Sequence, residues 1–408
     1  MTTNNPSLGM TYDPFDRHLE NPYSFYTQLR HEEPITFSPC INAYLVSRYD
    51  DIHSILSQPD TFSSKDTLTP GITMYPRTIA ELSKGYPFVP TAVNADGANH
   101  VRLREPLQKM FAPVRIRAME PLIRQIATRL VDGFINDGHA EIISQLAYPL
   151  PLEVVLTLLG VPQKDMEEIK RLSDDWNALI LSPLPEERQV AHAQSLLTLH
   201  RYIAQLIEQR RSAPREDGIT DLLNACIPGE EPLSEAELIH TVAGVILAGY
   251  VTTTNLIGNG LVLLLEEPTR WRTLCEHPDL IPSAIEEILR YHDPVPGLTR
   301  TTTREVTVGG VVMPAGTKLF LLYSAANRDE TQFPLADQFD MQRKPNRHLA
   351  FGYGGHFCVG APLGRLEGRI TFEMLTQRLP GMRLVANQKL SHVPNLIHYG
   401  YQSVEVEW

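Results

Sequence analysis

The residues best suited to chemistry lie in one glycine-rich segment near the end of the chain, 351–360, which reads Phe-Gly-Tyr-Gly-Gly-His-Phe-Cys-Val-Gly. Four glycines in ten residues predict a backbone that turns tightly or approaches another group closely. Cys358 lies immediately before a predicted helix, whose N-terminus and nearby amide groups should lower the thiol pKa. The thiolate is a candidate metal ligand, whereas a lone cysteine is more often a small buried apolar side chain.

A second candidate is the run Ala248-Gly249-Tyr250-Val251-Thr252-Thr253 within the longest predicted helix, Ser234 to Glu267. Ser234-x-x-Glu237 is a capping box, and Pro268 ends the pattern. A helix this long and apolar is expected to cross the centre of the protein. Thr252 carries a hydroxyl that could act on a ligand, or that could simply bond the carbonyl four residues earlier.

The third candidate is a pair of opposite charges, Glu287 and Arg290, on a predicted helix. Residues at i and i+3 share one helix face and can form an ion pair. Such a pair is weak evidence by itself, because surface pairs are common and contribute little.

The glycine-rich segment resembles the haem-binding loop of the cytochrome P450 superfamily, Phe-Gly-x-Gly-x-His-x-Cys-x-Gly, at every specified position. The resemblance implies a mainly α fold with small β-sheets, shaped like a triangular prism. Haem b would lie between the long central helix and the helix after the cysteine loop. Cys358 would then ligate the iron, an axial chemistry known for this family. Phe351, Gly352, His356 and Gly360 would contact the cofactor.

Other segments resemble the family in the same order along the chain. Glu287-Ile288-Leu289-Arg290 is similar to its Glu-x-x-Arg motif, with Arg343 as the candidate third member of a structural ion cluster. His100-x-x-x-Arg104 resembles the helix that holds the haem propionates, and Arg300 and His356 occupy further propionate positions. Buried carboxylates need cationic or hydrogen-bonding partners, which is the physical reason for such a set.

The central helix resembles the oxygen-binding groove of the family, with one departure. Ala248 and Gly249 are small enough for the helix to pass close to the iron, and Thr252 would hydrogen-bond dioxygen and organise water. Val251 occupies a position usually held by Asp or Glu. Because valine cannot carry a proton, we expect Thr252 to keep its role and water to deliver the protons.

The resemblance implies a monooxygenase that adds one oxygen atom of O2 to a hydrophobic small molecule, by hydroxylation or epoxidation. A polyketide, macrolide, terpenoid or steroid-like substrate is expected. The pocket should be apolar; its expected wall, besides Ala248, is Val245, Val295, Leu298, Leu396 and Ile397. Residues 62–95, which show no periodicity, and the stretch 176–181 are candidate lids.

The sequence contains no flavin or iron–sulfur motif, so electrons are expected from a separate ferredoxin and its reductase, or from a flavodoxin. Basic residues near the cysteine loop could steer such an acidic carrier; they are Lys109, Arg115, Arg117, Lys344, Arg347, Arg365 and Arg369. Two alternatives remain. Val251 favours a peroxide-driven haem-thiolate peroxygenase, which Thr252 disfavours, and a non-catalytic haem-thiolate sensor or ligand carrier would not need Thr252.

Length and composition fit one enzyme domain, residues 1–408. The formal net charge of -12 argues against nucleic acid or an anionic membrane as a partner. The four cysteines, Cys40, Cys226, Cys275 and Cys358, form no CxxC pair and suggest a reducing compartment. The N-terminus lacks a signal-peptide pattern, and the apolar runs 242–249 and 261–265 are too short to span a bilayer. A cytoplasmic monomer is expected.

Periodicity and turn residues predict the remaining elements. Helices are expected at 22–31 with Asn21 as N-cap, 49–57, 119–136, 196–211, 282–291 and 361–379. Strands are expected at 43–47, 306–312 and 318–323. Helix should clearly exceed strand.

Overall fold

A computed structural model describes residues 7–67, 73–225 and 231–408. Cys226 and residues 68–72 of the candidate lid lie outside the described residues. The α-helices are α1 (Leu8–Thr11), α2 (Tyr23–Glu32), α3 (Tyr49–Leu56), α4 (Pro76–Leu82), α5 (Gly97–Met110), α6 (Pro113–Ala118), α7 (Glu120–Asp132), α8 (Pro149–Leu159), α9 (Met166–Leu181), α10 (Glu186–Ser212), α11 (Gly218–Leu223), α12 (Glu235–Leu265), α13 (Pro268–Glu276), α14 (Ile281–Tyr291), α15 (Tyr323–Ala326) and α16 (Ala361–Arg378). Short helical turns are η1 (Ile143–Ala147), η2 (Gln163–Asp165), η3 (Pro278–Leu280) and η4 (Gly354–His356).

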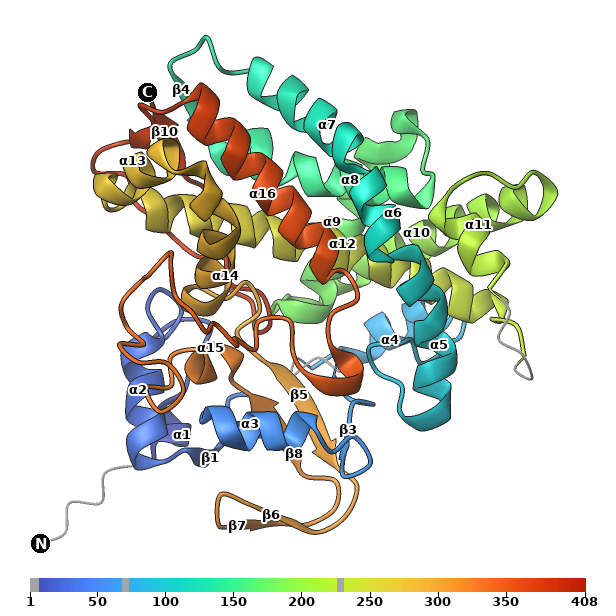
Figure 1. The fold of residues 1–408 in the computed structure, drawn as a ribbon. Helices are drawn as coiled ribbons and strands as arrows, with labels where there is room; N and C mark the ends of the chain where they lie inside the picture. The colour runs from blue at the N-terminus through green and yellow to red at the C-terminus, as the bar shows by residue number, and fades with distance from the viewer. Residues whose placement is uncertain (1–6, 68–72, 226–230) are drawn as a thin grey trace, which may run out of the picture.

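The strands form three small sheets at the margins of the helices. They are β1 (Ile35–Ser38), β2 (Ala43–Val46), β3 (Phe62–Ser63), β4 (His139–Glu141), β5 (Leu298–Thr302), β6 (Val306–Val308), β7 (Val311–Met313), β8 (Lys318–Leu321), β9 (Arg383–Leu384) and β10 (Glu405–Glu407). The largest sheet has the order β1-β2-β8-β5-β3, in which only β2 and β8 are parallel. It lies with α2, α3 and α15 at one end of the molecule, below the larger helical part (Figure 1). The predicted mainly α fold with small sheets is confirmed.

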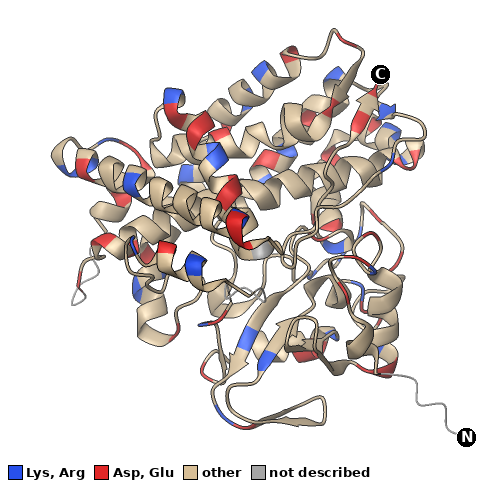
Figure 2. Ribbon diagram, turned by 180° about the vertical axis from the view of Figure 1, so that it is seen from behind, with Lys and Arg blue, Asp and Glu red and all other residues tan. Residues whose placement is uncertain are grey.

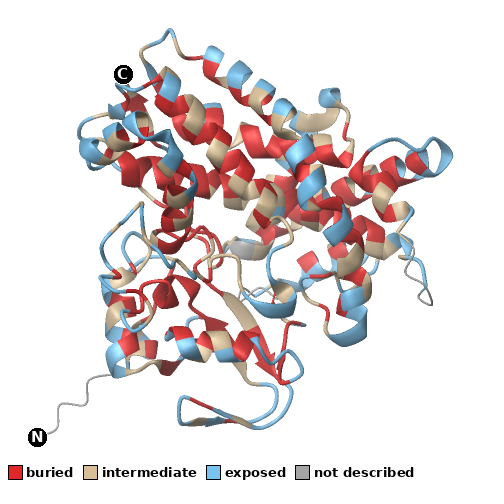
Figure 3. Cartoon of the chain, in the orientation of Figure 1, coloured by how far each residue is buried: buried red, intermediate tan, exposed pale blue. Residues whose placement is uncertain are grey.

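Helix α12 is the axis of the helical part. Its capping box is confirmed, since the side chain of Ser234 accepts from the amide of Glu237 and the Glu237 carboxylate accepts from the amide of Ser234. Most residues of α12 are buried, as the helical part of Figure 3 illustrates. Contrary to the estimate from its separate apolar runs, α12 as a whole is long and apolar enough to cross a membrane. Because it is largely buried among other helices, we describe it as a core helix.

The predicted elements exist, but several boundaries were wrong. Helix α2 begins at Tyr23 with Pro22 as its N-cap, and the Asn21 side chain accepts from the amide of Tyr23. Helix α10 begins ten residues before the predicted start at 196, and the expected strand 306–312 is the hairpin of β6 and β7. The candidate lid 62–95 was predicted to lack regular structure, yet it contains α4, which begins on Pro76. Proline is typical of loops but also well suited to the first turn of a helix. The loop-like composition of 62–95 therefore gave no sign of α4.

Candidate active site

The cysteine loop folds back on itself before α16. The amide of Cys358 donates to the carbonyl of Phe351 at 2.9 Å, and the amide of Phe357 donates to the carbonyl of Gly354 at 3.1 Å. Gly354 has φ +70°, and a Cβ there would lie 2.8 Å from the carbonyl oxygen of Leu56. The glycine therefore permits both a left-handed backbone and close contact with α3. This geometry presents the Cys358 sulfur beside the N-terminus of α16.

The pKa of the Cys358 thiol is raised, which corrects the prediction that the loop would lower it. Burial is the largest cause. The amide groups of Gly360 and Ala361 and the cations Arg104 and Arg365 act in the expected direction but do not outweigh it. The protein thus supplies donors for an anionic sulfur within a desolvated site. Although Cys358 is enclosed by the fold, its side chain is accessible, as is that of Ala248 on α12.

The predicted oxygen groove lies at the middle of α12. The hydroxyl of Thr252 donates to the carbonyl of Ala248 at 2.9 Å, so the bond considered in the sequence analysis is present. Its oxygen still has lone pairs with which to accept a hydrogen bond. A Cβ at Gly249 would lie 2.7 Å from Cγ2 of Val155, which shows that α12 packs closely on α8 here. Val251 is partly buried against the main hydrophobic core.

Four basic side chains meet between α5, β5 and the cysteine loop, as the sequence predicted. The rings of His100 and His356 lie 3.9 Å apart, and a guanidinium nitrogen of Arg104 donates to the carbonyl of Phe357. Arg300 is 5% exposed and bonds only neutral groups among the described residues, the Thr67 hydroxyl and the Thr299 carbonyl.

The electrostatics of this cluster favour an anion. Burial first, and then the nearby His100, Arg300 and Arg104, lower the pKa of His356 to about 3. Burial also lowers the pKa of His100, whose Nε2 is buried with no hydrogen-bond partner among the described residues. Buried cations and unpaired donors are costly unless an acceptor satisfies them. Carboxylates, such as the two propionates of haem, fit this cluster chemically.

Glu287, Arg290 and Arg343 form a fully enclosed ion cluster. Arg290 is bidentate to Glu287, with both N···O distances 2.7 Å, and neither side chain is exposed. Nε of Arg343 lies 3.1 Å from both Glu287 oxygens, and Asn346 donates to the same carboxylate at 3.1 Å. Arg290 also donates to three backbone carbonyls of the segment 327–338. The cluster therefore fixes α14 to the chain that leads into the cysteine loop.

The basic residues expected near the cysteine loop are only partly free. Arg365 pairs with Glu286 at 2.7 Å and Arg369 with Glu120 at 2.8 Å, while Lys109 and Arg115 pair with Glu105 and Asp221. Along the helices, acidic and basic positions are interspersed, as the coloured ribbon in Figure 2 shows. A cavity of about 250 Å³ opens here among Arg117, Arg365 and Arg369. Within the described chain, no carboxylate partner is found for Arg117, Lys344 or Arg347.

The predicted pocket residues come from two hydrophobic clusters. Val245 lies in the core around α12, whereas Leu298, Leu396 and Ile397 pack in a cluster with the large sheet. Val295 is partly buried. Ile180, near the end of α9, packs against both clusters and so lies between the two sets of expected wall residues.

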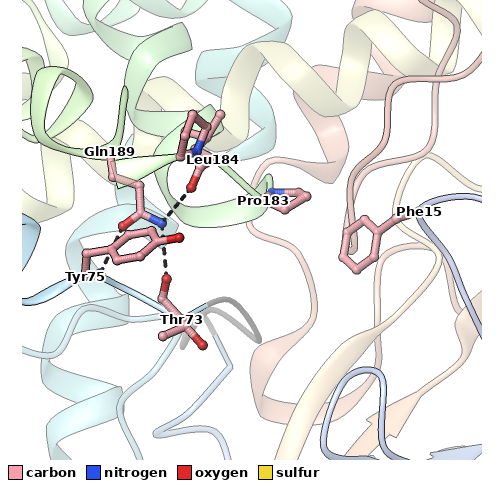
Figure 4. Close-up of a pocket in the computed structure, with 7 residues that line it drawn as sticks. Phe15, Thr73, Tyr75, Pro183, Leu184 and Gln189 are labelled. Carbon is pink, nitrogen blue, oxygen red and sulfur yellow. Dashed lines mark hydrogen bonds between the residues drawn. The ribbon is translucent and has the colours of Figure 1, made fainter. Parts of the chain in front are cut away.

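Gln189 was also missed. It is 1% exposed, and its side chain accepts from the amide of Tyr75 and donates to the carbonyls of Thr73 and Leu184 (Figure 4). It also accepts from the hydroxyl of Thr78. It thus ties α4 and the segment before it to α10. A cavity of about 480 Å³ opens beside these groups, also lined by Phe15 and Pro183. The helix predicted at 196–211 begins after Gln189, so no pattern in the sequence assigned this residue to a helix.

Helix α16 contains a second unanticipated group, Glu367, whose carboxylate oxygens are buried without a partner among the described residues. Burial raises its pKa to about 8, and the nearby Thr253 hydroxyl only partly opposes this. The side chain is therefore largely neutral at pH 7.

An accessible thiol beside the start of α16 and a cationic edge suited to carboxylates are features expected of a haem-thiolate protein. The sequence model described as Cytochrome P450 matches residues 41–380. The chain is 32% identical to putative cytochrome P450 YjiB of Bacillus subtilis, over 95% of this chain and 94% of that protein. It is 35% identical to the mycinamicin IV hydroxylase/epoxidase of Micromonospora griseorubida, over 94% of each. The P450 heme domain of Tepidiphilus thermophilus superposes with a TM-score of 0.93 at 34% identity, covering 98% of this chain and 97% of that one.

The chain therefore belongs to the cytochrome P450 family, and it is a monooxygenase of the oxidoreductase class.

Proposed function

We propose that the protein hydroxylates or epoxidises a bulky hydrophobic small molecule, with a polyketide or macrolide as the first candidate. The family and the relative named for mycinamicin IV support this class. So do the apolar side chains of the two clusters that supply the expected wall residues. A terpenoid or steroid-like substrate fits the same apolar wall and is an outcome that the experiment below distinguishes.

The cofactor is haem b, with Cys358 as the iron ligand. When bound, haem would supply the chemistry that activates dioxygen for transfer of one oxygen atom to the substrate. His100, Arg104, Arg300 and His356 would hold the two propionates, for which their charges and unpaired donors are suited. Phe351, Gly352 and Gly360 would form the surface beneath the ring. The Glu287 cluster keeps the segment leading into this loop in place.

The residues of α12 control the oxygen and the protons. Ala248 leaves room beside the helix, Gly249 lets α12 pack closely on α8, and the Thr252 hydroxyl would accept a hydrogen bond from a water molecule and orient it. The apolar side chain of Val251 binds no water and cannot exchange a proton. Ordered water that contacts Thr252 would therefore deliver the protons. Thr252→Ala should then divert most of the NAD(P)H electrons to hydrogen peroxide. Unchanged coupling of NAD(P)H to product would refute this role.

Electrons would come from a ferredoxin and its reductase, or from a flavodoxin, docking over the cavity beside Arg117. The unpaired cations Arg117, Lys344 and Arg347 are the strongest candidates to attract an acidic carrier. A cytoplasmic monomer without membrane contact is the expected state.

The single observation that carries the assignment is the accessible Cys358 sulfur beside the start of α16. The reduced protein, reconstituted with haem and exposed to carbon monoxide, should absorb near the thiolate-specific wavelength, and Cys358→Ser should not. A folded wild-type protein without that band would overturn the proposal. Screening macrolides, polyketides, terpenoids and steroids for shifts of the Soret band then identifies the substrate class. NAD(P)H turnover with surrogate ferredoxin separates the enzyme from a sensor, and peroxide alone separates it from a peroxygenase.

A further inference from the structure

Three helices meet at one carboxylate that the proposed chemistry does not use. Asp174 of α9 accepts from the hydroxyl of Tyr250 on α12 at 2.8 Å. It also accepts from the hydroxyl of Tyr148, just before α8, at 2.7 and 2.8 Å from its two oxygens. The two tyrosine rings pack edge to face with centroids 5.3 Å apart. Tyr250 is 1% exposed, whereas Asp174 and Tyr148 are half-buried.

The environment keeps the two tyrosines as donors and Asp174 as the acceptor. Burial is the largest cause raising the pKa of both hydroxyls, and the charge of Asp174 raises them further. Burial raises the pKa of Asp174 itself, while the tyrosine hydroxyls and the cation Lys170 oppose this. The Lys170 ammonium lies 4.9 Å from the centre of the Tyr148 ring. The remaining charged neighbour is Asp175, which bonds His192 and Ser195 instead.

Tyr250 lies on the back of the oxygen groove. Residues two apart on an α-helix point about 200° away from each other, so Tyr250 is opposite both Ala248 and Thr252. Gly249, which lies between Ala248 and Tyr250 in the sequence, has no side chain and packs directly on Val155 of α8. A shift of Asp174 would therefore rotate or translate the segment that carries the groove.

Helix α9 connects this point to the substrate side. Within the described chain, the bond from Tyr250 to Asp174 is the only side-chain hydrogen bond between α9 and α12. Two turns further along α9, Ile180 packs against both the α12 core and the cluster of Leu298 and Leu396. A molecule bound against these apolar side chains would contact the end of α9. Asp174 lies in the middle of the same helix.

We propose that Asp174 and Tyr250 form a positioning pair that couples α9 to the oxygen-binding face of α12. Occupancy of the pocket beside Ile180 is transmitted through this bond to Ala248 and Thr252. The groups that bind oxygen and deliver protons thereby reach their working positions when substrate is bound. The inference rests on the proposed haem monooxygenase, and Asp174 and Tyr250 themselves touch neither substrate nor cofactor.

The test measures hydrogen–deuterium exchange of the amides in 246–254, with and without 4-phenylimidazole, in the haem-loaded protein. This azole ligates haem iron and places a phenyl group in the pocket. In the wild type, the ligand should slow exchange of these amides at least threefold. Tyr250→Phe, which removes only the hydroxyl, should lose most of that protection while binding the azole with a Kd within twofold of wild type.

A matched control removes another bond between a tyrosine and an aspartate at the other end of the same helix. The Tyr202 hydroxyl donates to Asp165, just before α9, at 2.8 Å. Tyr202→Phe should retain full ligand-induced protection of 246–254. The pair has no coupling role if Tyr250→Phe keeps that protection, if Tyr202→Phe loses it equally, or if the wild type shows none. The carbon monoxide spectrum of the same samples reports the haem-thiolate assignment separately.

Discussion

The two sides of the proposed haem site are held in different ways. On the cysteine side, Glu287 and Arg290 are completely buried, and their charges are satisfied by each other, by Arg343 and by backbone carbonyls. On the α12 side, hydrogen bonds rather than a buried ion cluster hold the elements: Tyr250 to Asp174, Gln189 to the segment 73–78 and Leu184, and His240 to Pro87. The contrast indicates a fixed platform for the metal ligand and an adjustable cover for the substrate.

This difference has a physical reason. A buried charge tolerates no loss of its partners, so a network of charges keeps one geometry. A hydrogen bond is worth about 1 kcal/mol between neutral groups and about 1.5–3 kcal/mol where it is made to a carboxylate such as Asp174, so these links can open and close at lower cost than the buried ion cluster. Loops and helices that admit a ligand must come from the less stable parts of a protein.

The largest effect should follow from breaking the fixed side. Glu287→Ala leaves the Arg290 guanidinium buried without an anion, which should cost about 3–5 kcal/mol, a large share of the stability of a typical domain. We expect a much lower thermal midpoint and almost no haem incorporation. Arg383→Ala removes a surface pair of 3.0 Å and should cost less than about 1 kcal/mol. Equal losses for both variants would show that burial does not distinguish the two pairs.

The fixed side was also the more predictable one, because much of it is local in sequence. The glycines in 352–355 predict a tight loop. Glu287 and Arg290 are three residues apart, so they share one helix face. Arg343, 56 residues beyond Glu287, could be proposed only through the family resemblance. The sign of the Cys358 pKa shift was missed because burial depends on the whole fold, whereas the helix N-terminus is visible locally.

The adjustable side depends on contacts that no local pattern encodes. Gln189 meets Tyr75 across 114 residues, and Tyr250 meets Asp174 across 76. Each of these residues alone looks like an ordinary polar side chain on a helix. The same limitation affected the basic surface, where Arg369 is neutralised by Glu120, 249 residues away. Sequence therefore predicted the types of residue at the site better than their partners.

The next largest effect concerns the cationic edge between the two sides. Arg300→Leu removes a buried guanidinium that has no carboxylate partner among the described residues. Hydrogen bonds to charged groups are worth about 1.5–3 kcal/mol, so haem should leave roughly ten- to a hundredfold faster. Transfer of haem to excess apomyoglobin measures this rate. The control is Arg304→Leu, which changes an exposed arginine just beyond β5 that bonds Thr61; this variant should behave as wild type.

A smaller effect is expected where the cover is linked by neutral groups. Gln189→Leu removes the four bonds between the segment 73–78, Leu184 and α10. The cover should open more often, so stopped-flow binding and release of 4-phenylimidazole should both accelerate about three- to tenfold. Gln194→Leu changes an exposed glutamine on the same helix and should leave both rates unaltered. If only the release rate changed, the bonds of Gln189 would stabilise the bound ligand and would not control opening of the cover.

The smallest effect should be a pH dependence that arises on the cover side. His200 of α10 packs against His240 of α12, over which the exposed Phe88 stacks, and both nitrogens of His200 are buried without partners among the described residues. Burial, and then His240, lower the pKa of His200 to about 3. The unfolded chain binds a proton near pH 6.5 and the folded protein does not, so stability is full above 6.5 and is lost progressively as pH falls toward 3. His200→Phe cannot take up that proton, and its thermal midpoint should fall less than that of the wild type between pH 7 and 5. His139→Gln, at an exposed site, should follow the wild type; identical slopes for all three proteins would place the acid sensitivity elsewhere.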